Sequence, residues 1–185
     1  MIETVYLAGP ITGLSFADAI GWREEATEEL TALGYEVFSP MREKFHLKEE
    51  FGDTPLPHTH HSFADPFPRD VMDIKRSDFV LCNLLQWDGT TPLVGTSVEL
   101  GMAKAMGKFI ITVRKPGFAL HPFLAGCSDL VMDTLERAYE WLAHMQPVRV
   151  GRVVTFDLPD DLSGNYDSNF MGEGNPFGPG IQVRM

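Results

Sequence analysis

The chain has 185 residues, of which 44% are hydrophobic and 22% charged. This composition allows one domain of about 150 residues with an appendage, and a core that needs no disulfides or metals. The formal net charge is −11 and the 15 Lys and Arg residues are scattered, which excludes a nucleic-acid polymer as partner because such binding needs a basic face. No apolar run approaches the ~20 residues of a membrane helix, and no basic segment precedes the first predicted strand. We therefore expect a cytoplasmic protein that does not enter a membrane, with Cys82 and Cys127 as reduced thiols.

The N-terminal part of the chain has the pattern of a strand, a helix and a second strand. Residues Ile2–Ala8 are largely β-branched and aromatic and end at a Gly-Pro pair, which predicts a buried strand. Helical spacing of apolar residues predicts a helix over Ser15–Leu33, capped by its first residue and ended by Gly34. A strand over Tyr35–Phe38 follows at once. A unit of this kind implies a parallel sheet.

The remaining elements follow a long irregular segment. Residues Ser39–Pro68 contain five prolines and no periodicity, which predicts a long loop of the kind that is either a functional lid or disordered. The elements expected after it are a helix over Arg69–Arg76, a strand over Asp78–Leu84, a helix over Gly95–Met106, a strand over Lys108–Val113, a short strand over Leu130–Met132 and a helix over Thr134–His144. The expected fold class is therefore α/β: a doubly wound, flavodoxin- or Rossmann-like sheet of about five parallel strands with helices on both faces.

Residues 147–185 differ in composition from residues 1–146, which form the expected α/β domain. Val148–Phe156 has the pattern of an edge strand, and after it Asp, Asn, Gly and Pro dominate. Two interpretations are open for Asn169–Met185. It is a solvated tail, or it is an arm, because it also carries large apolar side chains. The second interpretation predicts an arm over the ligand crevice of its own or a neighbouring subunit.

Ligands of open α/β sheets bind beyond the carboxyl ends of the strands. The loop after the first strand is Gly9-Pro10-Ile11-Thr12-Gly13. Its glycines allow a ligand to approach the backbone, and the following helix N-terminus favours anions or sugar hydroxyls. The loop lacks the signatures of a nucleotide-binding P-loop or a dinucleotide fold, and a plain tight turn explains it equally well.

Two further segments place carboxylates at the same edge. In Gly95–Gly101 a glycine-led turn begins a helix, and we expect Glu99 in the first helical turn, where the helix N-terminus keeps it ionised. It then either compensates the helix dipole or acts as a nucleophile at an anomeric carbon. Asp70, which follows Arg69, is either a helix N-terminal acid or the second carboxyl group, which moves a proton to or from a leaving base.

These motifs resemble the nucleoside 2-deoxyribosyltransferase family, whose superfamily also contains nucleoside 5′-monophosphate N-glycosidases. The resemblance spans about residues 2–135 and rests on Tyr6-Leu7-Ala8-Gly9-Pro10, Arg69-Asp70, Gly95-Thr96-Ser97-Val98-Glu99-Leu100-Gly101-Met102-Ala103 and Lys108. It implies that Glu99 is the nucleophile that forms a glycosyl ester, that Tyr6 orients Glu99 by a hydrogen bond, and that Asp70 acts near the base and its proton. Water or a second base then resolves the ester. The resemblance implies no metal or organic cofactor, and a homo-oligomer whose subunits complete each other's sites.

Three positions depart from the pattern of the transferases. Leu93 stands where the family has an acid about six residues before the nucleophile, and the nearest acid is Asp88. Leu130 falls near the position of an asparagine that a neighbouring subunit donates to the sugar 5′-hydroxyl. The usual C-terminal tyrosine is replaced by a tail that ends in Met185. These departures concern base exchange and 5′-hydroxyl recognition rather than attack by Glu99.

The expected partner is a small nucleoside or nucleotide. The residues expected to bind it are Gly9, Pro10, Ile11, Thr12, Arg42, Asp88, Gly95, Thr96 and Ser97. Loop hydroxyls and Arg42 are suited to a phosphate, so two enzymes remain open. The first is a nucleoside 2-deoxyribosyltransferase-like enzyme that transfers the glycosyl group to a base or to water, and the alternative is a (deoxy)nucleoside 5′-monophosphate N-glycosidase. A nucleotide sensor without turnover is the third possibility, but a sensor needs no unpaired carboxylate at C1′.

Other residues are better explained without chemistry of their own. His58, His60 and His61 lie in the proline-rich segment without nearby cysteines or helical spacing, so we expect a solvated loop and no metal site. Trp87 either stacks on a base or covers the core.

Overall fold

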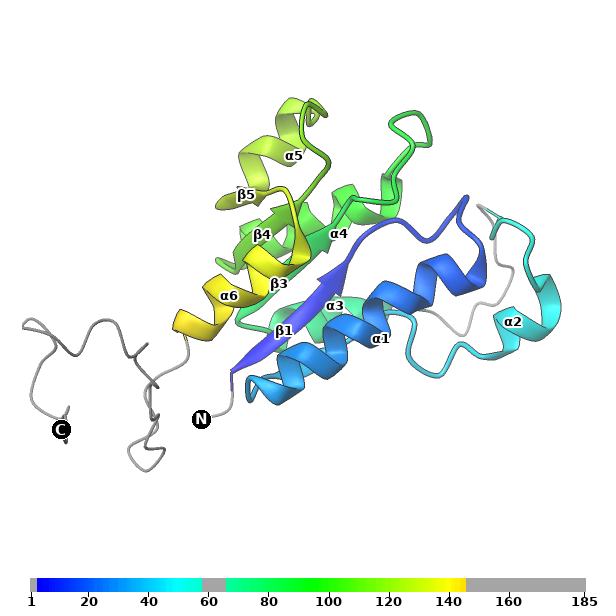
Figure 1. Cartoon of the computed structure of the whole chain (residues 1–185), viewed down its shortest axis with the longest axis horizontal. Helices are drawn as coiled ribbons and strands as arrows, with labels where there is room; N and C mark the ends of the chain where they lie inside the picture. Colours follow the sequence, from blue (N-terminus) through cyan, green and yellow to red (C-terminus); the bar gives the residue numbers. More distant parts are fainter. Residues whose placement is uncertain (1–2, 58–65, 146–185) are drawn as a thin grey trace, which may run out of the picture. The chain divides into compact units, whose positions relative to one another are not determined.

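A computed structural model of the chain describes residues 3–57 and 66–145 (Figure 1). His58, His60 and His61 and the whole C-terminal extension lie outside the described residues. The expectations for a solvated histidine loop, an edge strand over Val148–Phe156 and an arm over the crevice therefore stay predictions.

Five strands form one parallel sheet in the order β2-β1-β3-β4-β5. Their bounds are Thr4–Ala8 (β1), Glu36–Phe38 (β2), Phe79–Asn83 (β3), Phe109–Val113 (β4) and Leu130–Met132 (β5). The chain moves outward from β1 to β2 and returns to the other side of β1 at β3, so the strand order reverses there. This is the flavodoxin-like order, and it confirms the predicted fold class.

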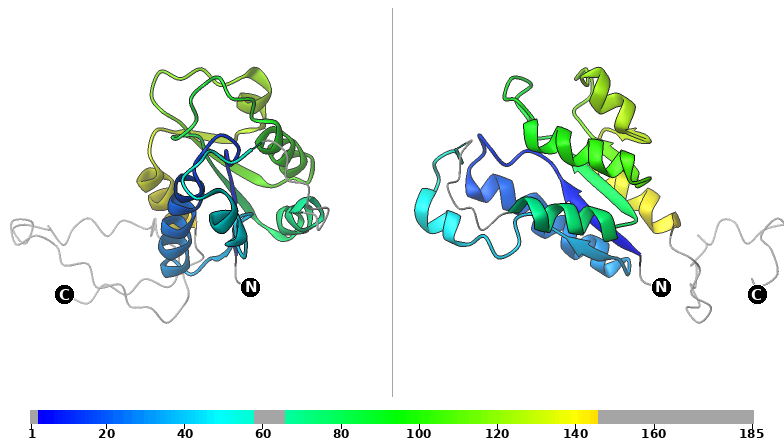
Figure 2. Two further views of the ribbon diagram at one scale, coloured as in Figure 1. Left: turned by 90° about the vertical axis from the view of Figure 1, so that its right-hand side faces the viewer. Right: turned by 180° about the vertical axis from the view of Figure 1, so that it is seen from behind.

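Helices cover both faces of the sheet, as the two views of Figure 2 show. On one face lie α1 (Phe16–Ala32) and α6 (Leu135–Met145), and on the other lie α3 (Pro66–Arg76), α4 (Val94–Ala105) and α5 (Pro122–Cys127). Successive residues of a strand point to opposite faces. In β1, Val5 and Leu7 therefore join the core beneath α1 and α6, and Tyr6 and Ala8 join the core beneath α3 and α4. This alternation places Tyr6 on the same face as the helix that carries Glu99.

Helix α1 has the ends that its sequence predicts. Ser15 is the N-cap: its Oγ accepts a 3.1 Å hydrogen bond from the Asp18 amide and donates one of 2.7 Å to the Asp18 carboxylate. Gly34 adopts a φ of 95°, a conformation open to glycine, directly after the helix. Both ends of α1 therefore lie where the sequence indicates them.

Two short helices and two helix starts differ from the predictions. The segment predicted as a loop contains α2 (His46–Phe51), and α5 was not predicted. Each has only six residues, too few to show a helical period, and each is held instead by a buried leucine, Leu47 or Leu124. Helix α3 begins at Pro66 instead of Arg69, and α4 begins at Val94. Over residues 3–57 and 66–145, no helix has the length and apolar character needed to cross a membrane.

Candidate active site

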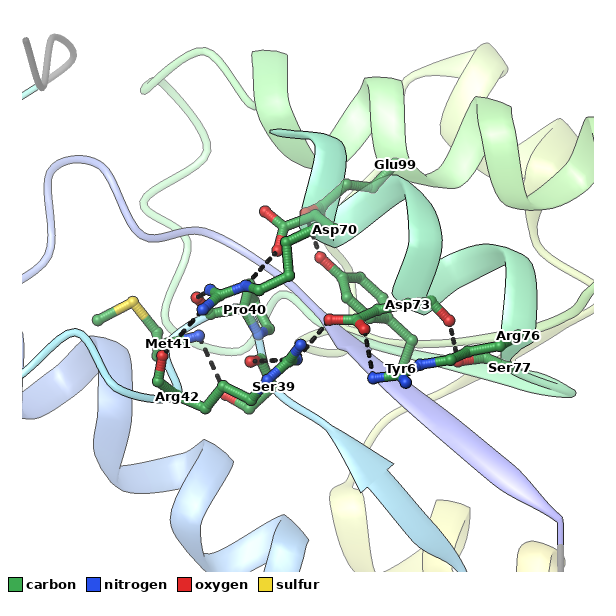
Figure 3. A network of polar contacts seen from close by, with 11 residues as sticks. Tyr6, Ser39, Pro40, Met41, Arg42, Asp70, Asp73, Arg76, Ser77 and Glu99 are labelled. Atoms are coloured by element: carbon green, nitrogen blue, oxygen red, sulfur yellow. Dashed lines mark hydrogen bonds and ion pairs between the residues drawn. The ribbon is translucent and has the colours of Figure 1, made fainter. Parts of the chain in front are cut away.

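The three side chains expected to perform chemistry converge on one side of β1 (Figure 3). Tyr6 comes from the middle of β1, Asp70 from α3 and Glu99 from α4. The Tyr6 hydroxyl donates a 2.7 Å hydrogen bond to Glu99 Oε1. Oε1 is thus occupied, and Oε2 of Glu99 has no hydrogen-bond partner in the described part of the chain. The structure therefore contains the hydrogen bond that the resemblance implied.

Burial dominates the electrostatics of Glu99 and raises its pKa to about 7. The hydrogen bond from Tyr6 and the positive charges of Arg23 and Lys44 act in the opposite direction, and the Asp70 charge adds to the increase. The expectation that a helix N-terminus keeps Glu99 ionised is wrong. The helix begins at Val94 and has no acid in its first turn, so Glu99 lies beyond the range of the terminal dipole, and loss of water outweighs it.

Tyr6 is held in its protonated form. Its side chain is completely buried, and burial, followed by the charges of Glu99 and Asp70, raises the pKa of its hydroxyl far above the ordinary value. A tyrosine that does not ionise remains a hydrogen-bond donor at every physiological pH. Tyr6 thus supplies a constant donor to Glu99.

One oxygen of the Asp70 carboxylate lies at ion-pair distance from Arg69 but accepts no hydrogen bond from the described residues. Asp70 Oδ1 is buried without a hydrogen-bond partner among the described residues, and so is Nε of the adjacent Arg69, 3.8 Å away. Burial raises the pKa of Asp70, and the charges of Lys44 and Arg69 oppose the increase. Since α3 has no acid in its first turn, the explanation of Asp70 as a helix-terminal acid is wrong. A buried carboxyl group with an open position is suited to bind or protonate a base.

Arg42, which was expected to bind substrate, is engaged by the protein. One of its nitrogens forms a short ion pair with Asp73, which also pairs with Arg76 at 2.7 Å. Arg69 in turn donates to the carbonyls of Pro40 (2.8 Å) and Arg42 (3.3 Å). Figure 3 shows this network beside Tyr6. Its effect is to fasten the segment after β2 to α3, next to Asp70.

The glycine of the loop after β1 lies close to the protein's own backbone. The approach of a ligand was one expected reason for a glycine there. Gly9 has a φ of 151°, and a Cβ there would lie 2.6 Å from the backbone oxygen of Asn83 at the end of β3. Pro10 is buried, and Ile11 and Thr12 are half-buried. The glycine is thus required by the contact between the ends of β1 and β3.

The expected ligand residues before and at the start of α4 have local roles or remain available. Asp88 is exposed, and its carboxylate accepts bonds of 2.7–2.8 Å from the backbone and hydroxyl of Thr91 and the amide of Thr90. These bonds lower its pKa and explain Asp88 as a turn residue. Thr96 is buried, whereas Gly95 and Ser97 are exposed in the first turn of the helix.

Trp87 belongs to the protein's own packing. Its ring packs against the core on the α3–α4 face, lies edge-on to Phe118 at 6.0 Å, and donates a 2.7 Å hydrogen bond from Nε1 to the Thr91 carbonyl. These contacts support the core interpretation of Trp87 over base stacking.

Two cations near the carboxylates were missed by the sequence reasoning. Arg23 is completely buried in α1 and Lys44 is half-buried after β2, and both act on Glu99 and Asp70 through their charges. A signal for Arg23 was present, because it occupies the apolar stripe of its helix between Ala19 and Ala26. Lys44 lies in an irregular segment, where the sequence carries no such signal.

Other chemical groups add little to the site. Cys82 and Cys127 are free thiols as expected, and burial raises the pKa of Cys82. In the described ranges, no cluster of three His, Cys, Asp or Glu side chains is arranged to hold a metal ion.

Comparisons with known proteins identify the fold and the family of the chain. Solved structures with the same fold include a conserved protein from Enterococcus faecalis V583 (15% identity, TM-score 0.57, covering 79% of this chain and 100% of the other). They also include a 2-deoxyribosyltransferase from Bacillus psychrosaccharolyticus (20%, 0.53, 74% and 90%) and a 2-desoxiribosyltransferase from Leishmania mexicana (16%, 0.54, 78% and 99%). No curated protein sequence matches the chain. The family model for nucleoside 2-deoxyribosyltransferase matches residues 5–146, so the chain belongs to the nucleoside 2-deoxyribosyltransferase family.

Proposed function

We propose that the protein cleaves the N-glycosidic bond of a (deoxy)nucleoside in two displacement steps. In the first, an oxygen of Glu99 attacks C1′, the bond from C1′ to the base nitrogen breaks, and its electron pair leaves with the base, which Asp70 protonates. In the second, water or another base attacks C1′ of the glycosyl ester and releases Glu99, while Asp70 accepts the proton. This is the chemistry of retaining glycosidases, with one carboxylate as nucleophile and one as acid and base.

The observation that carries this proposal is the state of the Glu99 carboxylate. Tyr6 occupies Oε1 and orients the group, and Oε2 is left without a partner in the described residues. A carboxylate held in one orientation with a free oxygen lone pair is prepared for nucleophilic attack. A carboxylate with only a structural role would be expected to have its oxygens satisfied, as those of Asp73 are by Arg42 and Arg76. The same contrast speaks against a sensor without turnover.

The engagement of Arg42 supports a nucleoside over a nucleoside 5′-monophosphate. Its guanidinium is the charge that the sequence offered to a phosphate, and it is paired with Asp73. The alternative, a 5′-monophosphate N-glycosidase, relies on the loop hydroxyls and the exposed first turn of α4. Transfer and hydrolysis share the first step, the attack by Glu99. Leu93, which stands in place of the transferases' acid, concerns base exchange and not this attack.

The test is a chromatographic screen for released base. Nucleosides and 5′-monophosphates, deoxy and ribo, are incubated with and without an acceptor base, using wild type, Glu99→Gln and the exposed helix variant Glu140→Gln as matched control. Wild type and the control should release base equally. Glu99→Gln should lose nearly all activity, because an amide does not form the ester. Retention of more than about a tenth of wild-type turnover, under ~1.4 kcal/mol of barrier, would contradict the assignment. A 2-fluoro-sugar substrate should add its glycosyl mass to the peptide that contains Glu99.

A further inference from the structure

Arg23 is a buried charge without a carboxylate partner. Its side chain is 1% exposed. It donates to the carbonyls of Ala19 (2.5 Å) and Gly9 (2.9 Å), and its guanidinium carbon lies 4.5 Å from the centre of the Trp22 ring. Its Nε has no hydrogen-bond partner, and it forms no ion pair within the described ranges. An enclosed cation of this kind is costly unless negative charge nearby compensates it.

The negative charge that compensates Arg23 lies at the active site. Helix α1 packs on the sheet face opposite α3 and α4, yet Arg23 reaches the end of β1 at Gly9, three residues after Tyr6. From there its charge favours ionised Glu99, and the charges of Glu99 and Asp70 favour the charged form of Arg23. Arg23 thus acts on the site from beneath the first loop, at a range longer than an ion pair.

Several groups from different elements determine whether Glu99 ionises. Tyr6 of β1 donates a hydrogen bond to it, Asp70 of α3 repels its charge, and Lys44 after β2 attracts it. The thiol of Cys82 in β3 also faces the Glu99 charge. Of the two cations, Lys44 is half-buried and donates no side-chain hydrogen bond in the described part of the chain, whereas Arg23 is enclosed and held by two carbonyls. An enclosed charge is less screened by water and salt.

We propose that Arg23 is a positioning residue for Glu99: a permanent buried counter-ion that keeps the carboxylate available in its ionised form at neutral pH while it holds the Gly9 carbonyl at the end of β1. The inference rests on the proposed function only in treating ionised Glu99 as the working form. It predicts that the charge of Arg23, and not only the shape of its side chain, favours the ionised form of Glu99. Lysine at this position should therefore preserve the behaviour of Glu99, and methionine should not.

The test is a carbon-13 NMR titration of the Glu99 carboxyl group, assigned by its disappearance in Glu99→Gln. We compare wild type, Arg23→Met, Arg23→Lys and Arg137→Met, a matched control at an exposed arginine of α6. The Glu99 midpoint should rise by about half a pH unit or more in Arg23→Met. It should stay near the wild-type value in the lysine variant and the control. A folded Arg23→Met protein with an unchanged midpoint, or a lysine variant that shifts as far as methionine, would overturn the proposal.

A second measurement needs no substitution at Arg23, and so does not depend on the stability of its variants. In wild type, the proton–nitrogen signal of Arg23 Nε should move with pH through the same midpoint as Glu99, and this movement should vanish in Glu99→Gln. A signal that does not sense Glu99 would refute the coupling. Both readouts are independent of turnover. If the screen finds no base release but Arg23 and Glu99 titrate together, the proposed function fails and the Arg23 inference stands. If base is released but the two residues titrate independently, the proposed function stands and the Arg23 inference fails.

Discussion

The hydroxyl of Tyr6 donates a 2.7 Å hydrogen bond to Oε1 of Glu99, across 93 positions of sequence. The two residues meet because Tyr6 points to the sheet face that α4 covers. Burial acts on both in the same direction: it raises both pKa values, so that the tyrosine stays neutral and the glutamate is harder to ionise. The hydrogen bond is the direct contact that favours the charged form of Glu99.

Replacing Tyr6 with phenylalanine should therefore move the pH dependence of catalysis. Loss of a donor to the carboxylate raises its pKa, and a nucleophile is active only when deprotonated. The acid limb of kcat/KM, set by Glu99 near pH 7, should shift upward by about half to one pH unit in Tyr6→Phe. Tyr139→Phe is the control, because this buried hydroxyl of α6 has no partner among the described residues. Coincident acid limbs in Tyr6→Phe and wild type would refute the role of the bond.

The raised pKa of Glu99 also makes a prediction about stability. Its folded value is about 7 against an ordinary 4.5, so between these values the unfolded chain has released a proton that the folded chain retains. Folding stability is then lost as pH rises from about 4.5 through 7. Glu99→Gln removes this cost and keeps an oxygen to accept from Tyr6. We expect the variant to be more stable than wild type by about 1–3 kcal/mol at pH 8, and the difference to disappear near pH 4. Urea unfolding at both pH values measures it, and a variant less stable at pH 8 would contradict the account.

The sequence predicts the sheet well because its elements depend on local patterns. Alternation in β1 and helical spacing in α1 reflect burial on fixed faces, and glycine at position 34 reflects a backbone requirement. The pairing of Tyr6 with Glu99 came from the family resemblance. The order of the strands then places β1 beneath α3 and α4, which brings Tyr6, Asp70 and Glu99 together.

The parts that sequence reasoning missed depend on tertiary contacts. Arg42 had the right charge for a phosphate, but a partner 31 residues away, Asp73, engages it. A dipole argument assigned Glu99 an easily ionised carboxylate, whereas desolvation by the folded core decides its pKa. The short α2 forms through the burial of Leu47 rather than through periodicity. None of these effects leaves a trace in spacing or composition.

Asp70 is expected to act on the leaving base. Asp70→Asn should slow cleavage by roughly 10²–10⁴, the usual range for a lost general acid or base. The loss should be smaller for substrates whose base departs readily without a proton, so a series of leaving groups provides the internal control. Single-turnover rates measure the effect. An equal loss across the series would assign Asp70 to positioning or structure instead of proton transfer.

Gly9 is expected to resist any side chain. In Gly9→Ala the new Cβ would lie 2.6 Å from the backbone oxygen of Asn83. The residue would also have to keep a φ of 151°, which alanine rarely adopts. The ends of β1 and β3 must separate, with a loss of about 1–3 kcal/mol of stability. Gly21→Ala in α1 is the matched control, because its Cβ meets nothing within 4 Å. It should stabilise the protein by about 0.4–1 kcal/mol. Thermal unfolding of both variants checks this, and equal melting temperatures for the two would contradict it.

The network centred on Asp73 is expected to support both the fold and the site. Its carboxylate is buried and paired with Arg42 and Arg76, whose own side chains are partly exposed. Asp73→Asn leaves both guanidiniums without a charge partner, and we expect a loss of about 1–3 kcal/mol, reduced from that of a fully buried pair by solvent screening. Asp133→Asn is the matched control, since its pair with Arg137 is exposed and should be worth little. Because Arg69 binds the carbonyls of Pro40 and Arg42 beside Asp70, Asp73→Asn should also raise KM more than the control does. Urea unfolding and steady-state kinetics measure the two effects. An Asp73 variant that matches the Asp133 variant in stability would show that the network is only a surface ion cluster.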